Sequence, residues 1–333
     1  MKAIKHYSYT SSLHQQLEAF VAEKRAMGYK FNTEAQRLWH FDKFVVAHGF
    51  SETAITKEMF ELWSVKTPNE SESNRVMRYA TVQKFSKFLI RIGIPSYLSN
   101  ARMSHKSKDF KAYIFTDDEI GRLLKSAHEI PYSAGSKVRY LVVPMLFTTL
   151  VCAGLRIGEA LNLERKHVVF DGDIVFLNVY SEKYDKQRLI PLGRDMSKKI
   201  RKYLDEIALK MPNTSLVFPS PSGNHYKHVT IQSIFSKLLW KAKISYGGRG
   251  KGPRIHDIRH TFAVKSLRKL ALSKKDPNDV FHFLSTYMGH ENLSATQDYI
   301  QLTSEIFPYI IQDMEAYVGH IIPALEVFQD EAN

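Results

Sequence analysis

The apolar pattern of the chain is interrupted at residues 104–111, and this interruption constrains the fold more than any other feature. The segment reads Ser-His-Lys-Ser-Lys-Asp-Phe-Lys, so it offers one large apolar side chain and three lysines. A capping box follows, with Thr116 at the cap and Glu119 three residues later, and such a box marks the first turn of a helix. We therefore expect two domains, residues 1–103 and 112–333, joined by a basic linker. The 333-residue chain is long enough for each domain to bury its own core.

The first domain is predicted to be helical. Apolar residues recur at helical spacing in four stretches, which are separated by Gly28, Gly49, Thr67-Pro68 and Gly93. The fourth helix should begin within residues 69–74, with an apolar face that extends to Ile92. Its opposite face carries Lys84, Lys87 and Arg91. Such a basic stripe is either a solvated helix face or a contact surface for a polyanion, and the sequence leaves both readings open.

The second domain is expected to combine helices with a small antiparallel sheet. The Asp171-Gly172 turn joins two short β-type runs, and a polar turn at 182–186 leads to a third run at 188–192. Periodic apolar residues predict helices at 142–150, 195–211 and 230–243. The expected fold class is therefore mainly α with a small antiparallel β-sheet.

The net charge indicates the class of partner. The chain carries a formal charge of +13 and has a pI near 9.5. Residues 1–105 hold 15 Lys and Arg against 9 Asp and Glu, and the remaining residues hold 32 against 25, so both domains are basic. Because no basic amphipathic anchor is visible, nucleic acid is a better match than a membrane surface.

Several kinds of site are excluded or disfavoured. The single cysteine, Cys152, rules out an internal disulfide and multi-cysteine metal sites. His256 and His260 have the spacing of a helical zinc pair, but Asp257 stands where a metalloprotease has Glu, and no third ligand is evident. The glycine-rich segment 247–254 lacks the pattern of a nucleotide-binding loop. No apolar run approaches the roughly 20 residues that span a bilayer, and no signal peptide is visible, so we expect a cytoplasmic protein without metal or other cofactor.

The second domain does supply a candidate nucleophile and several cations. A tyrosine phenol can attack phosphorus if the charge of the transferring group is neutralised and the leaving oxygen receives a proton. Arginine suits the first task, because its fork grips two phosphate oxygens, and histidine or lysine suits the second. In chain order the candidates are Arg156, Lys183, His256, Arg259, His290 and Tyr299. Taken singly, each has a structural alternative; Arg156, for example, could pair with Glu159 or Glu164.

The motifs around these six positions resemble the tyrosine recombinase, or phage integrase, family. They are Gly154-Leu155-Arg156-x-x-Glu159, Lys183 in a turn ahead of Arg188-Leu-Ile-Pro-Leu-Gly193, His256-Asp-Ile-Arg259-His260, and Gly289-His290 followed nine residues later by Tyr299. Order and spacing agree over most of residues 112–300, and Met288 replaces the leucine usual before Gly-His. The resemblance implies an α+β catalytic domain with a C-terminal helical tail from about 303. For residues 1–103 it implies a helical, SAM-like core-type DNA-binding domain.

The resemblance also implies a reaction. Tyr299 would attack the scissile phosphate, which gives a 3′-phosphotyrosine and a free 5′-hydroxyl. Arg156 and Arg259 would clamp the non-bridging oxygens. Because the covalent link stores the bond energy, strand exchange would need neither ATP nor a divalent metal.

The remaining three positions would handle protons and orientation. Lys183 would protonate the 5′ leaving oxygen, and His256 and His290 would orient the phosphate and assist proton transfer. Lys166 and Lys186 lie near enough in the sequence to be alternatives to Lys183.

The implied function is site-specific DNA recombination of the integrase, transposase or resolvase type. The implied partner is double-stranded DNA, on which a monomer or weak oligomer would assemble as a homotetramer that joins two sites. A type IB topoisomerase-like relaxation enzyme and a catalytically idle DNA-binding regulator on the same scaffold are the alternatives. Further basic residues expected to contact DNA are Lys84, Lys87, Arg91, Lys106, Lys108, Lys111, Lys251 and Arg254.

Overall fold

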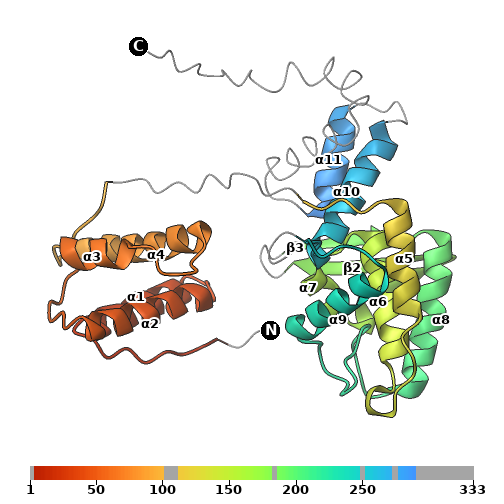
Figure 1. Cartoon of the computed structure of the whole chain (residues 1–333), viewed down its shortest axis with the longest axis horizontal. Helices are drawn as coiled ribbons and strands as arrows, with labels where there is room; N and C mark the ends of the chain where they lie inside the picture. The colour runs from red at the N-terminus through yellow and green to blue at the C-terminus, as the bar shows by residue number, and fades with distance from the viewer. Residues whose placement is uncertain (1–3, 101–111, 182–185, 248–251, 272–276, 290–333) are drawn as a thin grey trace. The chain divides into compact units, whose positions relative to one another are not determined.

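The computed structural model describes residues 4–100, 112–181, 186–247, 252–271 and 277–289. The chain divides into two compact units, Met1–Phe110 and Lys111–Asn333 (Figure 1). The predicted linker, the predicted turn with Lys183 and the predicted tail from about 303 lie outside the described residues.

The first unit consists of four helices, as the apolar spacing predicts. They are α1 (His14–Ala26), α2 (Asn32–Ala47), α3 (Lys57–Ser64) and α4 (Glu72–Arg91). Thr56 and Ser71 cap α3 and α4 through their hydroxyls, which accept hydrogen bonds from Met59 N–H and Asn74 N–H. The four helices share one core, in which Phe20, Phe41, Phe60 and Phe85 are buried. The prediction for Ile92 was wrong: α4 ends at Arg91, and Ile92 is 46% exposed.

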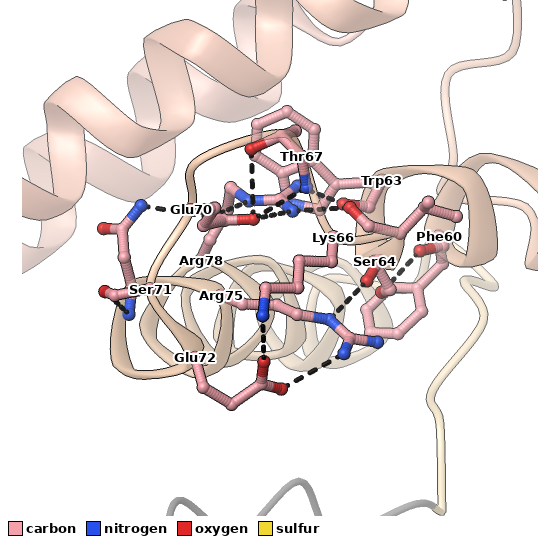
Figure 2. Close-up of polar contacts among 12 residues, drawn as sticks. Phe60, Trp63, Ser64, Lys66, Thr67, Glu70, Ser71, Glu72, Arg75 and Arg78 are labelled. Carbon is pink, nitrogen blue, oxygen red and sulfur yellow. Dashed lines mark hydrogen bonds and ion pairs between the residues drawn. The ribbon is translucent and has the colours of Figure 1, made fainter.

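Two arginines on α4 fasten it to the carboxyl end of α3 (Figure 2). Arg78 donates to both oxygens of Glu70 at 3.0 Å and to the carbonyls of Trp63 and Val65, and its guanidinium lies 4.5 Å from the centre of the Trp63 ring. Arg75 donates to the Ser64 carbonyl at 2.9 Å. The last carbonyls of a helix lack partners within it, so these cations satisfy them and complement the helix dipole.

The second unit contains seven α-helices and a three-stranded sheet in the described part of the chain. In chain order the elements are α5 (Asp117–His128), α6 (Arg139–Ala153), α7 (Ile157–Leu161), β1 (Val168–Asp171), β2 (Ile174–Ser181), β3 (Lys186–Pro191), α8 (Arg194–Lys210), α9 (His228–Lys241), α10 (Ile255–Ala271) and α11 (Pro277–Met288). The sheet is antiparallel in the order β1-β2-β3, so the expected fold class is confirmed.

Helix α6 is the buried centre of this unit. Val142, Leu146, Phe147 and Leu150 are at most 1% exposed, as its continuous apolar sequence predicts. Helices α10 and α11 pack against each other, and α10 also packs against α6 (Figure 1). No helix in the described part of the chain combines the length and the apolar character needed to cross a membrane.

Candidate active site

A glycine at the end of α6 brings Arg156 to α10. Gly154 has a φ of +58°, which L side chains rarely adopt, and a Cβ there would lie 2.3 Å from the Phe262 ring of α10. Only glycine permits this approach. The chain then enters α7 directly, with Arg156 at its cap position.

Arg156 is held by the carboxylate of Glu159, one turn further along α7. Glu159 accepts hydrogen bonds from the Arg156 backbone N–H at 2.8 Å and from Nη1 at 2.9 Å. Nη2 of Arg156 donates to the Gly289 carbonyl at 3.2 Å. The Arg156 side chain remains 29% exposed, whereas that of Glu159 is 6% exposed. The pairing with Glu159, which the sequence offers as a structural alternative, is therefore present.

Arg259 reaches the same carboxylate from α10. Its Nη1 lies 3.8 Å from Oε2 of Glu159 and donates to the Gly154 carbonyl at 2.9 Å, and its Nη2 donates to the Met288 carbonyl. The side chain is 2% exposed. Two arginines separated by about a hundred residues in the chain thus converge on one buried carboxyl group.

The charge state of Glu159 follows from these neighbours. Burial raises the pKa of this carboxyl, but the hydrogen bonds and charges of Arg188 and the charge of Arg259 outweigh burial and hold the pKa below its usual value. Glu159 is therefore ionised at neutral pH. It balances one of the guanidinium charges around it.

His256 lies one turn before Arg259 on α10 and is exposed to solvent. It lines a pocket of about 740 Å³ together with His228, Gln232 and Arg254. Partial burial lowers the pKa of His256 below its ordinary value, and the charges of His260, Arg259 and Arg156 lower it further. The ring is therefore neutral at pH 7.

Asp257 fixes the start of α10 and was not singled out by the sequence motifs as a site residue. Its buried carboxylate accepts from the Arg254 backbone N–H at 2.7 Å and from Nη2 of Arg254 at 3.1 Å. It is thus a cap for the helix that carries His256 and Arg259. The Arg254 side chain is 46% exposed and lines the pocket beside His256.

Arg188 of β3 belongs to one of the sequence motifs, but no role in the site was assigned to it from the sequence. Its guanidinium donates to both oxygens of Glu159, at 3.1 and 2.8 Å. A signal for it exists in the strand pattern, because Arg188 shares a face of β3 with the buried Ile190. A cation on the buried face of a strand requires a carboxylate partner.

Three of the six predicted site residues are described: Arg156 and Arg259 both reach Glu159, and His256 lies one turn before Arg259 on α10. The other three, Lys183, His290 and Tyr299, lie outside the described residues, as do Lys106, Lys108, Lys111 and Lys251. Gly289, directly before His290, has a φ of +63°.

The basic stripe of α4 lines a groove in the first unit. The groove has a volume of about 630 Å³, and its wall includes Lys84, Lys87 and Arg91 of α4 and Lys24 and Lys30 from the α1 region. Lys84, Lys87 and Arg91 are all exposed, and Phe88, which is 6% exposed, also lines the groove. Arg91 also pairs with Glu23.

Comparison with known proteins identifies the family. The model described as "Phage integrase family" matches residues 114–305, more than half of the chain. The chain belongs to the phage integrase family. The protein is thus a tyrosine recombinase, a site-specific DNA recombinase.

Two bacterial relatives match this chain over most of its length. The putative integrase/recombinase y4rB of Sinorhizobium fredii is 27% identical over 92% of this chain and 98% of its own length. The tyrosine recombinase XerC of Oceanobacillus iheyensis is 25% identical over 87% of this chain and 90% of its own. The structure of the XerH recombinase bound to palindromic difH substrate, a post-cleavage complex, has the same fold, with a TM-score of 0.64 and 20% identity over 92% of this chain and 84% of that one.

Proposed function

We propose that this recombinase cuts and rejoins DNA through a 3′-phosphotyrosine on Tyr299, with Arg156 and Arg259 as ligands of the scissile phosphate. The observation that carries the proposal is the convergence of both arginines on Glu159, with His256 one turn from Arg259. A phosphate that approaches Arg156 from its exposed edge would also meet His256.

The charges of this cluster suit the transition state of such a reaction. Arg156, Arg188 and Arg259 carry three positive charges and Glu159 carries one negative charge, which leaves a surplus of two. When a phenol attacks a phosphodiester, the non-bridging oxygens gain negative charge beyond the single charge of the ground state. Fixed positive groups stabilise this gain selectively, because they need no reorganisation during the reaction.

The roles of the other residues follow from their chemistry. Lys183 would protonate the 5′ leaving oxygen, since an ammonium can donate a proton to the alkoxide that forms there. His256 and His290 would donate hydrogen bonds to the non-bridging oxygens. In this mechanism the protein supplies all the positive charge at phosphorus, so neither ATP nor a metal or other cofactor takes part.

The first unit would contact DNA through the groove lined by Lys84, Lys87 and Arg91. Cations at i, i+3 and i+7 of one helix follow one line, which suits successive phosphates. Residues 1–103 would then be the core-type DNA-binding domain, 104–111 a basic linker and 112–333 the catalytic domain. Lys106, Lys108, Lys111, Lys251 and Arg254 would add further phosphate contacts.

The active assembly would be a homotetramer on two DNA sites. A palindromic site, such as the one in the XerH complex, presents the same half-site twice and so binds two copies of a recombinase related by a two-fold axis. Exchange between two such sites then requires four copies. Without DNA, the chain would be a monomer or a weak oligomer.

A suicide substrate tests the proposed nucleophile. DNA with a recombination site and a nick beside the scissile phosphate loses the 5′-hydroxyl fragment after cleavage, so the covalent complex accumulates and is visible on a denaturing gel. Tyr299→Phe should abolish this complex and leave DNA affinity within about threefold, because one hydroxyl contributes little to an interface dominated by phosphate contacts. Persistence of the complex in Tyr299→Phe would place the nucleophile elsewhere.

Tyr287→Phe is the matched control. The Tyr287 hydroxyl donates to the Ala153 carbonyl at 3.3 Å, and burial raises the pKa of this phenol to about 12. Its loss should leave the covalent complex intact. The same assay in EDTA should give full yield, and a strict requirement for Mg²⁺ would contradict the proposed mechanism.

A further inference from the structure

Arg188 differs from the other two arginines at Glu159 in what its donors reach. Nη1 and Nη2 bind both oxygens of the carboxylate, and Nε donates to the Tyr287 carbonyl at 2.9 Å. Each nitrogen of the side chain therefore has a protein acceptor, and the side chain is 12% exposed. Arg188 thus spans both oxygens of Glu159 with its two terminal nitrogens. Arg156 and Arg259 each approach this carboxylate with one terminal nitrogen, so Arg188 is the clamp that fixes its plane.

The clamp connects three segments that carry proposed catalytic residues. Arg188 lies on β3, which follows the segment with Lys183. Its first acceptor, Glu159, holds Arg156 on α7. Its second acceptor is the carbonyl of Tyr287, two residues before Gly289. A single side chain thus links β3, α7 and the end of α11.

Gly289 shows how closely the last of these segments approaches the clamp. A Cβ at this position would lie 3.1 Å from Nη1 of Arg188, and the φ of +63° is itself unfavourable for other residues. The Gly289 carbonyl accepts from Nη2 of Arg156 at 3.2 Å. The backbone directly before His290 therefore lies between Arg188 and Arg156.

Removal of Arg188 would release both acceptors. The Glu159 carboxylate would lose the bidentate pair that fixes its plane, and it could then rotate and take more hydrogen bonds from Arg156. Each donor drawn towards Glu159 is withdrawn from the phosphate. A displacement of about 1 Å in a group that binds the transition state lowers a rate by about 10²-fold.

We propose that Arg188 is a positioning residue for strand cleavage, which orients Arg156 through the Glu159 carboxylate and places the Gly289 backbone through the Tyr287 carbonyl. The proposal rests on the proposed function, in which Arg156 binds the scissile phosphate. Arg188 itself touches no reacting atom.

Arg188→Met tests the proposal in the full chain with the suicide substrate. Single-turnover formation of the covalent complex should slow by about 10²-fold, while the Kd for DNA changes by no more than about threefold. Arg201→Met is the matched control, because Arg201 donates to the Gly172 carbonyl at 2.5 Å and lies 4.6 Å from the Phe170 ring, with no contact to Glu159. It should cleave at the wild-type rate.

A methylphosphonate at the scissile position separates positioning from a general structural role. The methyl group removes the charge of one non-bridging oxygen, so the reaction depends less on Arg156. If Arg188 acts through Arg156, the rate penalty of Arg188→Met should be at least about tenfold smaller on this substrate. Equal penalties on the two substrates, or an unchanged rate on ordinary DNA, would overturn the proposal.

Two further measurements keep the test decisive. If circular dichroism shows that Arg188→Met does not fold, Arg188→Lys takes its place, because it keeps the charge but cannot span both Glu159 oxygens and the Tyr287 carbonyl. The rate penalty of Arg188→Lys on ordinary DNA is then compared with its penalty on the methylphosphonate substrate. A penalty at least about tenfold smaller on the methylphosphonate supports the proposal, and equal penalties overturn it. Failure of the wild-type chain to form any covalent complex would instead count against the proposed function.

Discussion

Each unit of this recombinase buries one glutamate against arginine, and the two arrangements differ in charge. Glu70 in the first unit is 3% exposed and pairs with a single guanidinium, that of Arg78, whose other donors bind the Trp63 and Val65 carbonyls. Glu159 in the second unit is 6% exposed and is surrounded by three guanidinium groups. The first cluster is neutral, and the second has a surplus of two positive charges.

The difference separates a structural ion pair from an anion site. The Arg78 donors reach Glu70 and the carbonyls of Trp63 and Val65 at the end of α3, so this cation is used in joining α4 to α3 (Figure 2). At Glu159, one carboxylate orients several cations without neutralising them all. Counting charges around a buried carboxylate therefore tells more than the presence of an ion pair, because a balanced pair has no charge left for a ligand.

The largest effect on cleavage is expected when a substitution reduces the surplus of positive charge around Glu159. Arg156→Ala removes a proposed phosphate ligand whose side chain is still 29% exposed. Single-turnover cleavage of the suicide substrate should fall by about 10³-fold, because the transition state then has one charged donor fewer. A fall of less than tenfold would mean that the surplus at Glu159 does not serve the reaction.

The matching change in the neutral cluster should affect stability instead. Arg78→Met leaves Glu70 buried without its partner, which should lower the free energy of unfolding of the first unit by about 3 kcal/mol. Urea denaturation of the full chain with Trp240→Phe in both proteins, followed by the fluorescence of Trp39 and Trp63 in the first unit, would measure the loss. Under conditions in which Arg78→Met is folded, its rate of cleavage should stay within about threefold of wild type. A large loss of cleavage rate would mean that the Glu70 cluster, like the Glu159 cluster, serves the reaction.

The lysines of the first unit fall into two groups that can be compared in the same way. Lys84 and Lys87 lie in the groove, whereas Lys57 and Lys66 pair with Glu61 and Glu72. The double change of Lys84 and Lys87 to Gln should reduce the slope of log K against log salt by about 1 to 2, since each phosphate that the protein neutralises adds about 0.9 to that slope. The same double change at Lys57 and Lys66 should leave the slope unaltered. Equal effects of the two double changes would remove the groove from the DNA interface.

The smallest effect is a shift in the pKa of His256, which responds to burial and to the charges of the nearby cations. Partial burial and the nearby cations lower the pKa of this ring in the free chain, so it is uncharged at pH 7. A bound phosphodiester adds a negative charge and should raise the pKa, so that DNA binding takes up a proton and is favoured as the pH falls. NMR titration of the ring, assigned with His256→Gln, should show both shifts. A pKa in the free chain above the ordinary value near 6.5 would contradict a net positive cluster.

The sequence predicted the helices, the antiparallel meander and the residues whose roles depend on local motifs. Apolar periodicity is a local property, so the four helices of the first unit and the buried helix α6 followed from it. Arg156, His256 and Arg259 followed from residue types that phosphate chemistry requires, set in recognisable motifs. The structure describes the convergence of Arg156 and Arg259 on Glu159, and the catalytic roles of all three residues remain predictions.

What the sequence did not provide depends on contacts between distant segments. Arg188 acquires its meaning from Glu159 and Tyr287, which lie 29 and 99 residues away. The stripe on α4 was read as lying opposite the apolar face, but Lys24 and Lys30 complete a groove with it. Neither arrangement follows from the periodicity of a single segment. The position of Arg188 on the inner face of β3 did, however, indicate that this cation needs a carboxylate partner.

Mass spectrometry of the DNA-linked peptide tests the central claim most directly. The covalent complex formed on a suicide substrate is trimmed with nuclease and cut with a glutamate-specific protease, which releases residues 292–305 as a peptide whose single tyrosine is Tyr299. The account predicts that this peptide carries the nucleotide remnant on Tyr299. A remnant on any other peptide, or its absence when the DNA is cleaved, would contradict the account.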